Sequence, residues 1–159
     1  MFAYLSDHMR LAPELARLHY AEWGPLLPDW SEAEALAELH THRSRQAIPT
    51  TMVMLDDDQR LIGSVSLLQN DDDRIRDYSP WLASLIVLPQ YRGRGFGIAL
   101  VERCVQEARA LDIPRLHLYT AGQQAFYRGL GWRVIDTVPL GIAPVDVMAI
   151  EPAPVGPTS

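Results

Sequence analysis

The chain has 159 residues, of which 48% are hydrophobic and 21% charged, proportions typical of one soluble globular domain. Twenty acidic residues against 14 basic ones give a net charge of −6, so we expect no nucleic acid as a partner. The longest apolar stretch, Trp81 to Leu88, is far shorter than the roughly 20 residues that cross a bilayer. Without an export signal or a pair of cysteines, a cytoplasmic protein that contacts no membrane is expected.

Two helices are predicted to precede most of the strands. Residues 2–5 form a short first strand, and apolar residues then recur at helical spacing from 11 to 21. Ser31 and Glu34 form a capping box, which opens a second helix ending near Arg43. These two helices therefore belong to the first third of the chain.

Three strands are predicted in the middle of the chain. Residues 51–55 and 60–69 are rich in β-branched and other apolar residues, and the polar turn between them indicates a hairpin. An acidic turn over residues 70–77 leads into a third strand at 81–88. The three strands are expected to form an antiparallel meander.

A helix predicted over residues 95–111 follows the third strand directly and leads to a short strand at 116–119. A strand, a helix and a strand in this order require a parallel pair within an otherwise antiparallel sheet. We therefore predict an α/β (α+β) fold whose mixed, mostly antiparallel sheet is flanked by helices. The remaining predicted elements are a short helix at 123–130, strands at 132–138 and 145–150, and a loose tail at 152–159.

The strongest chemical signal is a cluster of three glycines, Gly93, Gly95 and Gly97, between the third strand and its helix. Glycine allows close approach of a ligand to the backbone, and the N-terminus of the helix offers unpaired N–H groups. Amides from about Arg92 to Ile98 are thus placed to bind a pyrophosphate. The alternative is a glycine-rich helix start without a ligand.

Two common nucleotide-binding motifs are excluded by spacing and composition. A dinucleotide fingerprint that starts at Gly93 requires glycine or alanine where Ile98 stands. A P-loop requires a lysine, and all 14 basic residues of this chain are arginines.

Residues 92–97, Arg-Gly-Arg-Gly-Phe-Gly, resemble the acetyl-CoA signature of the GNAT superfamily of N-acetyltransferases, and residues 125–132 resemble its second signature. The resemblance implies one acetyl-CoA-binding domain over residues 1–151, with a parallel pair of strands that splay apart at the centre of the sheet. It also implies direct attack of a primary amine on acetyl-CoA in a ternary complex, without a metal.

The resemblance assigns acetyl-CoA to the gap between the two splayed strands. One strand pairs through its backbone with pantetheine, a backbone N–H near Val87 contacts the thioester oxygen, and the glycine-rich turn holds the pyrophosphate. The cofactor-binding residues implied are Leu85, Ile86, Val87, Arg92, Gly93, Arg94, Gly95, Phe96, Gly97, Ile98, Thr120, Gln123 and Phe126.

Tyr127 matches the position of a general acid in many relatives. A phenol with a pKa of about 10 can protonate a departing thiolate whose conjugate thiol has a pKa of about 8.5. The alternative is a tyrosine that only packs its short helix. A frequent asparagine of the family is missing, which leaves Thr120 or Gln123 to take its place.

The general base is not assigned, because residues 81–86 lack the carboxylate that many relatives carry on this strand. His19, Glu22, Asp77, His117 and water remain as alternatives. Cys104 is expected to be a small buried hydrophobic residue without a chemical role.

The resemblance places the acceptor site between the first two helices and the loop at 70–80. Tyr20, Trp23, Trp30, Asp77 and Tyr78 are the candidate substrate residues. Aromatic rings with nearby carboxylates, including Asp29 and Asp71–Asp73, suit a cationic amine, although tryptophans between helices are often core and aspartates in turns are often solvated.

Two functions remain as alternatives to acetylation of a small amine: acetylation of a protein N-terminus, and a non-catalytic acyl-CoA sensor. A small amine or a peptide N-terminus is therefore the expected partner. The sequence leaves a homodimer open.

Overall fold

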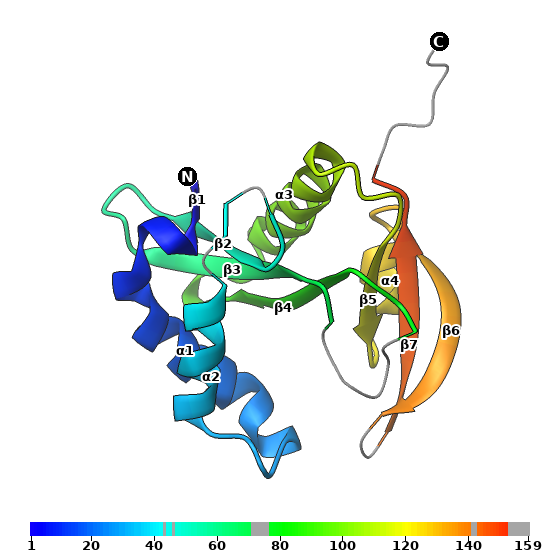
Figure 1. Ribbon diagram of the computed structural model, residues 1–159, viewed down its shortest axis with the longest axis horizontal. Coiled ribbons are helices and arrows are strands. Elements are labelled where there is room, and N and C mark those ends of the chain that lie inside the picture. The colour runs from blue at the N-terminus through cyan, green and yellow to red at the C-terminus, as the bar shows by residue number, and fades with distance from the viewer. Residues whose placement is uncertain (43, 46, 71–76, 141–142, 153–159) are drawn as a thin grey trace.

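The computed structural model describes residues 1–42, 44–45, 47–70, 77–140 and 143–152. Its seven-stranded sheet has the order β1-β2-β3-β4-β5-β7-β6, and helices flank it (Figure 1). The predicted mixed, mostly antiparallel sheet is confirmed, with β4 and β5 as the parallel pair. The strands are β1 (Phe2–Tyr4), β2 (Thr50–Leu55), β3 (Leu61–Leu68), β4 (Trp81–Val87), β5 (Leu116–Thr120), β6 (Arg133–Leu140) and β7 (Ala143–Ile150), and the helices α1 (Ala12–Trp23), α2 (Glu32–Thr41), α3 (Phe96–Ala110) and α4 (Gln124–Arg128).

The alternation of side chains along β2 explains why helices cover both faces of the sheet. Met52 and Met54 belong to the apolar cluster that includes α3, whereas Val53 and Leu55 belong to the cluster that includes α1 and α2. Neighbouring residues of a strand point to opposite faces, so α3 packs on one face and the pair α1 and α2 on the other. None of the helices in the described ranges is long and apolar enough to cross a membrane.

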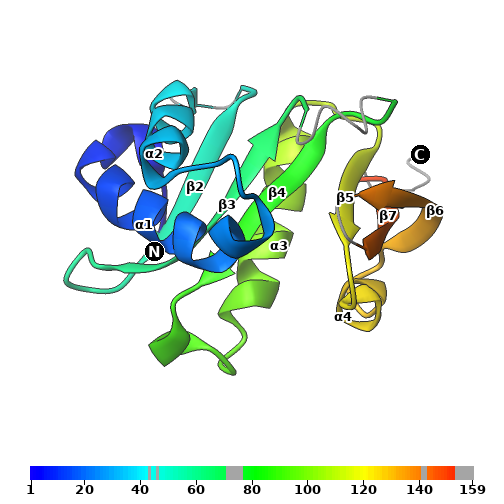
Figure 2. The same cartoon turned by 90° about the horizontal axis from the view of Figure 1, so that it is seen from below.

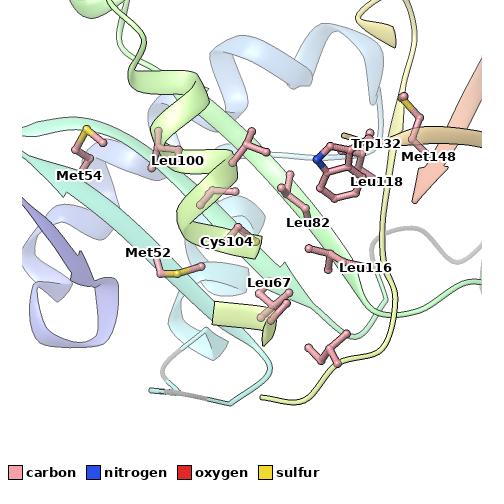
Figure 3. Packing of buried hydrophobic residues seen from close by; sticks show 14 of the residues in the cluster. Met52, Met54, Leu67, Leu82, Leu100, Cys104, Leu116, Leu118, Trp132 and Met148 are labelled. Carbon is pink, nitrogen blue, oxygen red and sulfur yellow. The ribbon is translucent and has the colours of Figure 1, made fainter. Parts of the chain in front are cut away.

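The core between α3 and the sheet contains the only cysteine of the chain. Cys104 is fully buried beside leucines and methionines of the strands (Figure 3). Its sulfur lies 3.9 Å from the carbonyl oxygen of Ser66, and burial raises the pKa of the thiol. Cys104 is thus the buried hydrophobic residue that the sequence predicts.

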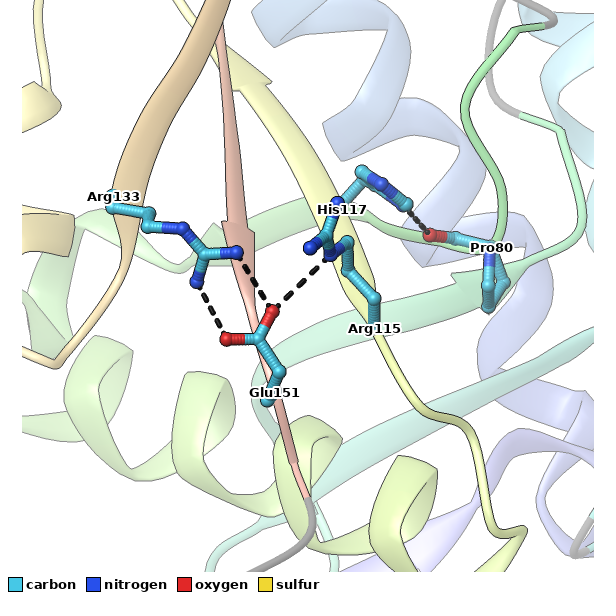
Figure 4. Close-up of polar contacts among 5 residues, drawn as sticks. All are labelled: Pro80, Arg115, His117, Arg133 and Glu151. Carbon is cyan, nitrogen blue, oxygen red and sulfur yellow. Dashed lines mark hydrogen bonds and ion pairs between the residues drawn. The ribbon is translucent and has the colours of Figure 1, made fainter. Parts of the chain in front are cut away.

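The parallel strands β4 and β5 are joined at one end only. Their one register pair is Trp81 with His117, and the His117 amide donates to the Pro80 carbonyl oxygen at 3.0 Å. Beyond this pair the two ribbons diverge toward α4 and the start of α3 (Figure 2). Near the closed end, Glu151 accepts from Arg133 at 2.6 and 2.9 Å and from Arg115 at 3.2 Å, which ties β5, β6 and the end of β7 together (Figure 4).

A β-bulge in β4 turns the strand where the gap opens. Ser84 adopts a positive φ of 55°, and the register against β3 shifts so that Ser84 and Leu85 both stand opposite Val65. A bulge bends its strand and changes which side chains face each side. As a result Leu82 and Leu85, three residues apart, both contact the core on the α3 side.

Most element boundaries differ from the predicted ones by one or two residues, and those of the last hairpin and of α2 have a particular cause or context. Strands β6 and β7 extend beyond the prolines at which the predicted strands end, so that Pro139 and Pro144 pair in register. Proline is tolerated there because β6 is an edge strand and β5 does not reach Pro144. Helix α2 ends at Thr41, and the predicted end at Arg43 lies outside the described residues.

The predicted loose tail begins with an ordered residue. Pro152 is buried, and its carbonyl oxygen accepts a hydrogen bond from Arg109 Nε at 2.7 Å. Residues 153–159 lie outside the described part of the chain.

Two histidines are enclosed between the helices and β2. His19 on α1 is 5% exposed, and its Nε2 is buried without a hydrogen-bond partner among the described residues. His42 Nδ1 lies 2.9 Å from the Thr51 hydroxyl, which lies 2.8 Å from that of Ser66. Burial, with His42 as a nearby like charge, lowers the pKa of His19 to about 4, and burial lowers that of His42 to about 4.

We expect these histidines to make the protein less stable in mild acid. Between pH 6.5 and 4 the unfolded chain binds protons that the folded histidines do not. The free energy of unfolding therefore decreases as the pH is lowered through this window. Each histidine contributes a loss of about 2 kcal/mol between pH 7 and pH 5. Urea denaturation at both pH values, for the wild type and His19→Leu, measures this loss. His19→Leu should lose less stability, and an equal pH dependence of the two proteins would contradict the assignment.

Candidate active site

The glycine-rich turn joins the end of β4 to α3 and exposes backbone amides. Gly93 and Gly95 have φ values of 78° and 85°, in the left-handed region where other residues are strained. Gly95 precedes the helix without a side-chain cap, and the Ala99 amide donates to the Gly95 carbonyl oxygen at 3.1 Å. The amides of the first helical residues therefore have no partner within the helix, and the positive end of its dipole lies beside them.

A cavity of about 560 Å³ lies against this turn. Its walls come from β4, the start of α3, α4 and the end of α1, on the side of the sheet where β4 and β5 have parted. Most of the cofactor-binding residues expected from the sequence line it. The lining residues are Glu22, Leu85, Ile86, Val87, Tyr91, Arg92, Gly93, Gly95, Phe96, Gly97, Ile98, Gln123, Phe126 and Tyr127.

Two of the expected cofactor-binding residues are not among those lining the cavity. The Arg94 guanidinium lies over the Tyr91 ring, 5.8 Å from its centroid. The Thr120 hydroxyl accepts a hydrogen bond from the Gln123 amide at 3.2 Å, which fixes the turn before α4. In this structure Thr120 therefore positions Gln123, which does line the cavity.

Tyr91 also lines the cavity, a role that was not predicted from the sequence. It ends a short 3₁₀ turn at Pro89–Tyr91, packs edge-on against Phe96 at 5.9 Å and donates to Asp56 Oδ2 at 3.3 Å. Its position just before the glycine-rich turn was the one feature of the sequence that could have indicated a place at the cavity.

Tyr127 is half-buried on α4 with its ring between two aromatic neighbours. Its ring centroid lies 5.0 Å from that of Phe126 and 6.2 Å from that of Trp132, and its carbonyl oxygen accepts from the amides of Leu130 and Trp132. Burial raises the pKa of the Tyr127 phenol. Within the described ranges its hydroxyl forms no hydrogen bond with the protein, which leaves it available to a ligand in the cavity.

Of the four side chains considered as general base, Glu22 alone lines the cavity. His19 is buried on the core side of α1, and His117 lies at the closed end of the strand pair with its Nδ1 3.1 Å from the Pro80 carbonyl oxygen. Asp77 is exposed outside the cavity. The carboxylate of Glu22 lies 3.8 Å from Arg92 Nη2.

The aromatic candidates for substrate binding separate into two groups. Tyr20 and Trp30 contact each other at 6.0 Å between centroids, and Trp23 packs with them against the α1 and α2 side of the core. Tyr78 instead packs against Trp81, and its hydroxyl donates to Asp136 on β6 at 2.6 Å. The expectation that all four gather at one mouth is therefore wrong for Tyr78, because its hydrogen bond holds it beside the closed end of the strand pair.

None of these aromatic residues lines the cavity, and neither do the described acidic candidates Asp29 and Asp77. Asp29 is exposed, and Asp71–Asp73 lie outside the described residues. Within the described part of the chain no three potential metal-ligating side chains come together.

The comparisons with known proteins agree with this geometry. A family model described as "Acetyltransferase (GNAT) family" matches residues 13–132. No curated protein matched by sequence. An aminoglycoside 6'-N-acetyltransferase complexed with coenzyme A is 17% identical with a TM-score of 0.75, covering 98% of this chain and 99% of that one.

Two further solved structures have the same fold. The structure of yncA, a putative acetyltransferase from Salmonella typhimurium with its cofactor acetyl-CoA, is 16% identical with a TM-score of 0.69 and covers 100% of this chain and 97% of that one. A spermidine N-acetyltransferase chimera from Vibrio cholerae and hSSAT is 22% identical with a TM-score of 0.68, covering 96% and 95%.

Proposed function

Because the chain belongs to the GNAT acetyltransferase family, we propose that it transfers an acetyl group from acetyl-CoA to a primary amine, by direct attack in a ternary complex. The observation that carries the proposal is one cavity lined both by the amide-rich glycine turn and by Tyr127. The solved neighbours include aminoglycoside and spermidine N-acetyltransferases, which supports an amine as the acceptor.

The residues that line the cavity fit acetyl-CoA. The unpaired amides at the start of α3 suit a pyrophosphate, and the Arg92 guanidinium adds positive charge beside them. Past Trp81, β4 has no register pair with β5, so β5 does not cover the edge of β4 at Leu85 to Val87, and amide groups of pantetheine can approach it there; the Val87 carbonyl oxygen accepts from Arg92 Nε at 3.0 Å. We further propose that residues 1–151 act as one domain, since the cavity walls extend from Glu22 to Tyr127.

Acetyl-CoA supplies the acetyl group in activated form as a thioester. The amides of residues 92–98 hold its pyrophosphate, and Val87 and Phe126 line the same cavity beside Gly97. As the new C–N bond forms and the C–S bond breaks, the Tyr127 hydroxyl donates its proton to the sulfur. An N–H proton of the acceptor restores the phenol through solvent. Overall, an ammonium and the thioester give an amide, a free thiol and one released proton.

Release of the CoA thiol in the presence of an acceptor panel tests the proposal. The panel contains kanamycin, spermidine, 2-phenylethylamine and short peptides with free N-termini, and mass spectrometry identifies each product. We expect steady turnover with at least one small amine. Turnover with peptides alone would favour N-terminal acetylation, whereas binding of acetyl-CoA without any turnover would reject the enzyme in favour of a sensor.

A further inference from the structure

Glu22 is the one residue with a carboxylate among the described residues that line the cavity. It is the penultimate residue of α1, a helix anchored to the core by buried Leu15, Ala16 and His19. The packed helix fixes the backbone of Glu22, and its half-exposed side chain lines the same cavity as Tyr127.

The position of Glu22 at the end of its helix is electrostatically unfavourable for stability. Carbonyl groups at a helix C-terminus carry partial negative charge, which favours cations there and disfavours carboxylates. The last turn of α1 contains no basic residue. The carboxylate and the helix end together therefore produce a negative potential that attracts a cation into the cavity.

In this structure the Glu22 carboxylate lies beside the side chain of Arg92. Its Nη2 lies 3.8 Å from Glu22 Oε1, while its Nε donates to the Val87 carbonyl oxygen at 3.0 Å. Arg92 also belongs to the turn whose amides suit a pyrophosphate. A bound pyrophosphate competes for this guanidinium, because phosphate oxygens form stronger charge-assisted hydrogen bonds with arginine than a carbonyl oxygen does.

From this arrangement we propose that Glu22 binds the ammonium group of the acceptor and takes up its proton. This inference rests on the proposed acetyl transfer. The proton passes from the acceptor nitrogen to a carboxylate oxygen and on to solvent, which frees the nitrogen lone pair for attack. A neutral glutamine at this position retains the size of the side chain but accepts no proton and attracts no cation.

The test compares Glu22→Gln with Glu102→Gln, which removes the same charge from an exposed position of α3 outside the cavity. With the best acceptor of the panel, Glu22→Gln should lower kcat/KM about 10- to 100-fold at pH 7, the range expected for a hydrogen bond to a charged group. The dissociation constant for acetyl-CoA should change less than twofold. Glu102→Gln should keep the wild-type values of both.

The pH dependence separates recognition of the cation from a structural role. Above the pKa of the amine the acceptor is neutral, so the kcat/KM of Glu22→Gln divided by that of the wild type should rise toward one. The titration of Tyr127 changes kcat/KM equally in both proteins and therefore does not change this ratio. A ratio that does not change with pH, or a variant within twofold of the wild type at pH 7, would overturn the assignment. If the wild type acetylates no amine of the panel, that result rejects the proposed acetyl transfer itself, before any variant of Glu22 is compared.

Discussion

Replacing Tyr127 with phenylalanine should lower kcat by about 10²- to 10⁴-fold and leave the affinity for acetyl-CoA nearly unchanged. The hydroxyl is needed only when negative charge develops on the sulfur, so its loss affects the transition state and not the bound ground state. Steady-state release of the CoA thiol gives kcat, and calorimetry gives the dissociation constant. The expectation rests on a phenol that lines the cavity and has no protein partner in the described ranges.

The pH profile offers an independent check on Tyr127. Burial raises the pKa of the phenol, so the protonated form persists above the ordinary value near 10. The alkaline limb of kcat should therefore lie above pH 10 in the wild type and disappear in Tyr127→Phe. A profile with the same alkaline limb in both proteins would assign that limb to another group.

Two outcomes would contradict the role of Tyr127 as proton donor. One is a wild-type kcat in Tyr127→Phe under conditions where pre-steady-state kinetics show that chemistry limits the rate. The other is a fall in kcat that accompanies a large fall in melting temperature, which would assign the ring to packing against Phe126 and Trp132. Thermal unfolding of both proteins distinguishes this second outcome.

Replacing Gly97 with tryptophan should weaken binding of acetyl-CoA by about 100-fold or more, equivalent to about 2.7 kcal/mol. A Cβ atom at Gly97 would lie 3.9 Å from both Phe126 Cζ and Val87 Cγ2, so a large side chain there fills the space between α4 and β4. Gly97 is the second residue of α3 and does not have a positive φ, so the backbone tolerates the substitution. Calorimetric titration with acetyl-CoA measures the loss.

Gly97→Ala is the matched control. Its methyl group makes ordinary van der Waals contacts with the same two side chains, and alanine favours a helix over glycine by up to about 1 kcal/mol. The alanine variant should therefore bind acetyl-CoA within a few-fold of the wild type and melt no lower. Wild-type affinity in a folded Gly97→Trp protein would place the cosubstrate elsewhere.

The parts of the site that lie close together in the sequence were predictable from it. Gly93 and Gly95 have the left-handed backbone that only glycine adopts readily, and Phe126 and Tyr127 belong to a short local motif. The parallel strand pair followed from the order of a strand, a helix and a strand. Each of these features depends on residues within about one supersecondary unit, where spacing limits geometry strongly.

The features that the sequence did not predict depend on contacts between distant segments. The sequence named Glu22 only as one of several candidate bases, because its place at the cavity depends on α1 lying beside the glycine turn, about 70 residues later in the chain. Tyr78 was placed with the wrong aromatic group because its hydrogen bond partner, Asp136, lies on the last hairpin. The bulge at Ser84 contains no glycine or proline from which it could have been predicted.

The one-ended junction of β4 and β5 divides the sheet into two plates, β1 to β4 and β5 to β7, that meet along a short seam at Trp81 and His117. The cavity has walls on both sides of the gap, with Leu85 to Val87 on β4 and with Phe126 and Tyr127 on α4, the helix that follows β5. A ligand in the cavity therefore connects the two parts of the sheet at the end where β4 and β5 are not paired. In hydrogen exchange, amides of β5 should gain protection on ligand binding together with those of β4, although the two strands share almost no direct bonds.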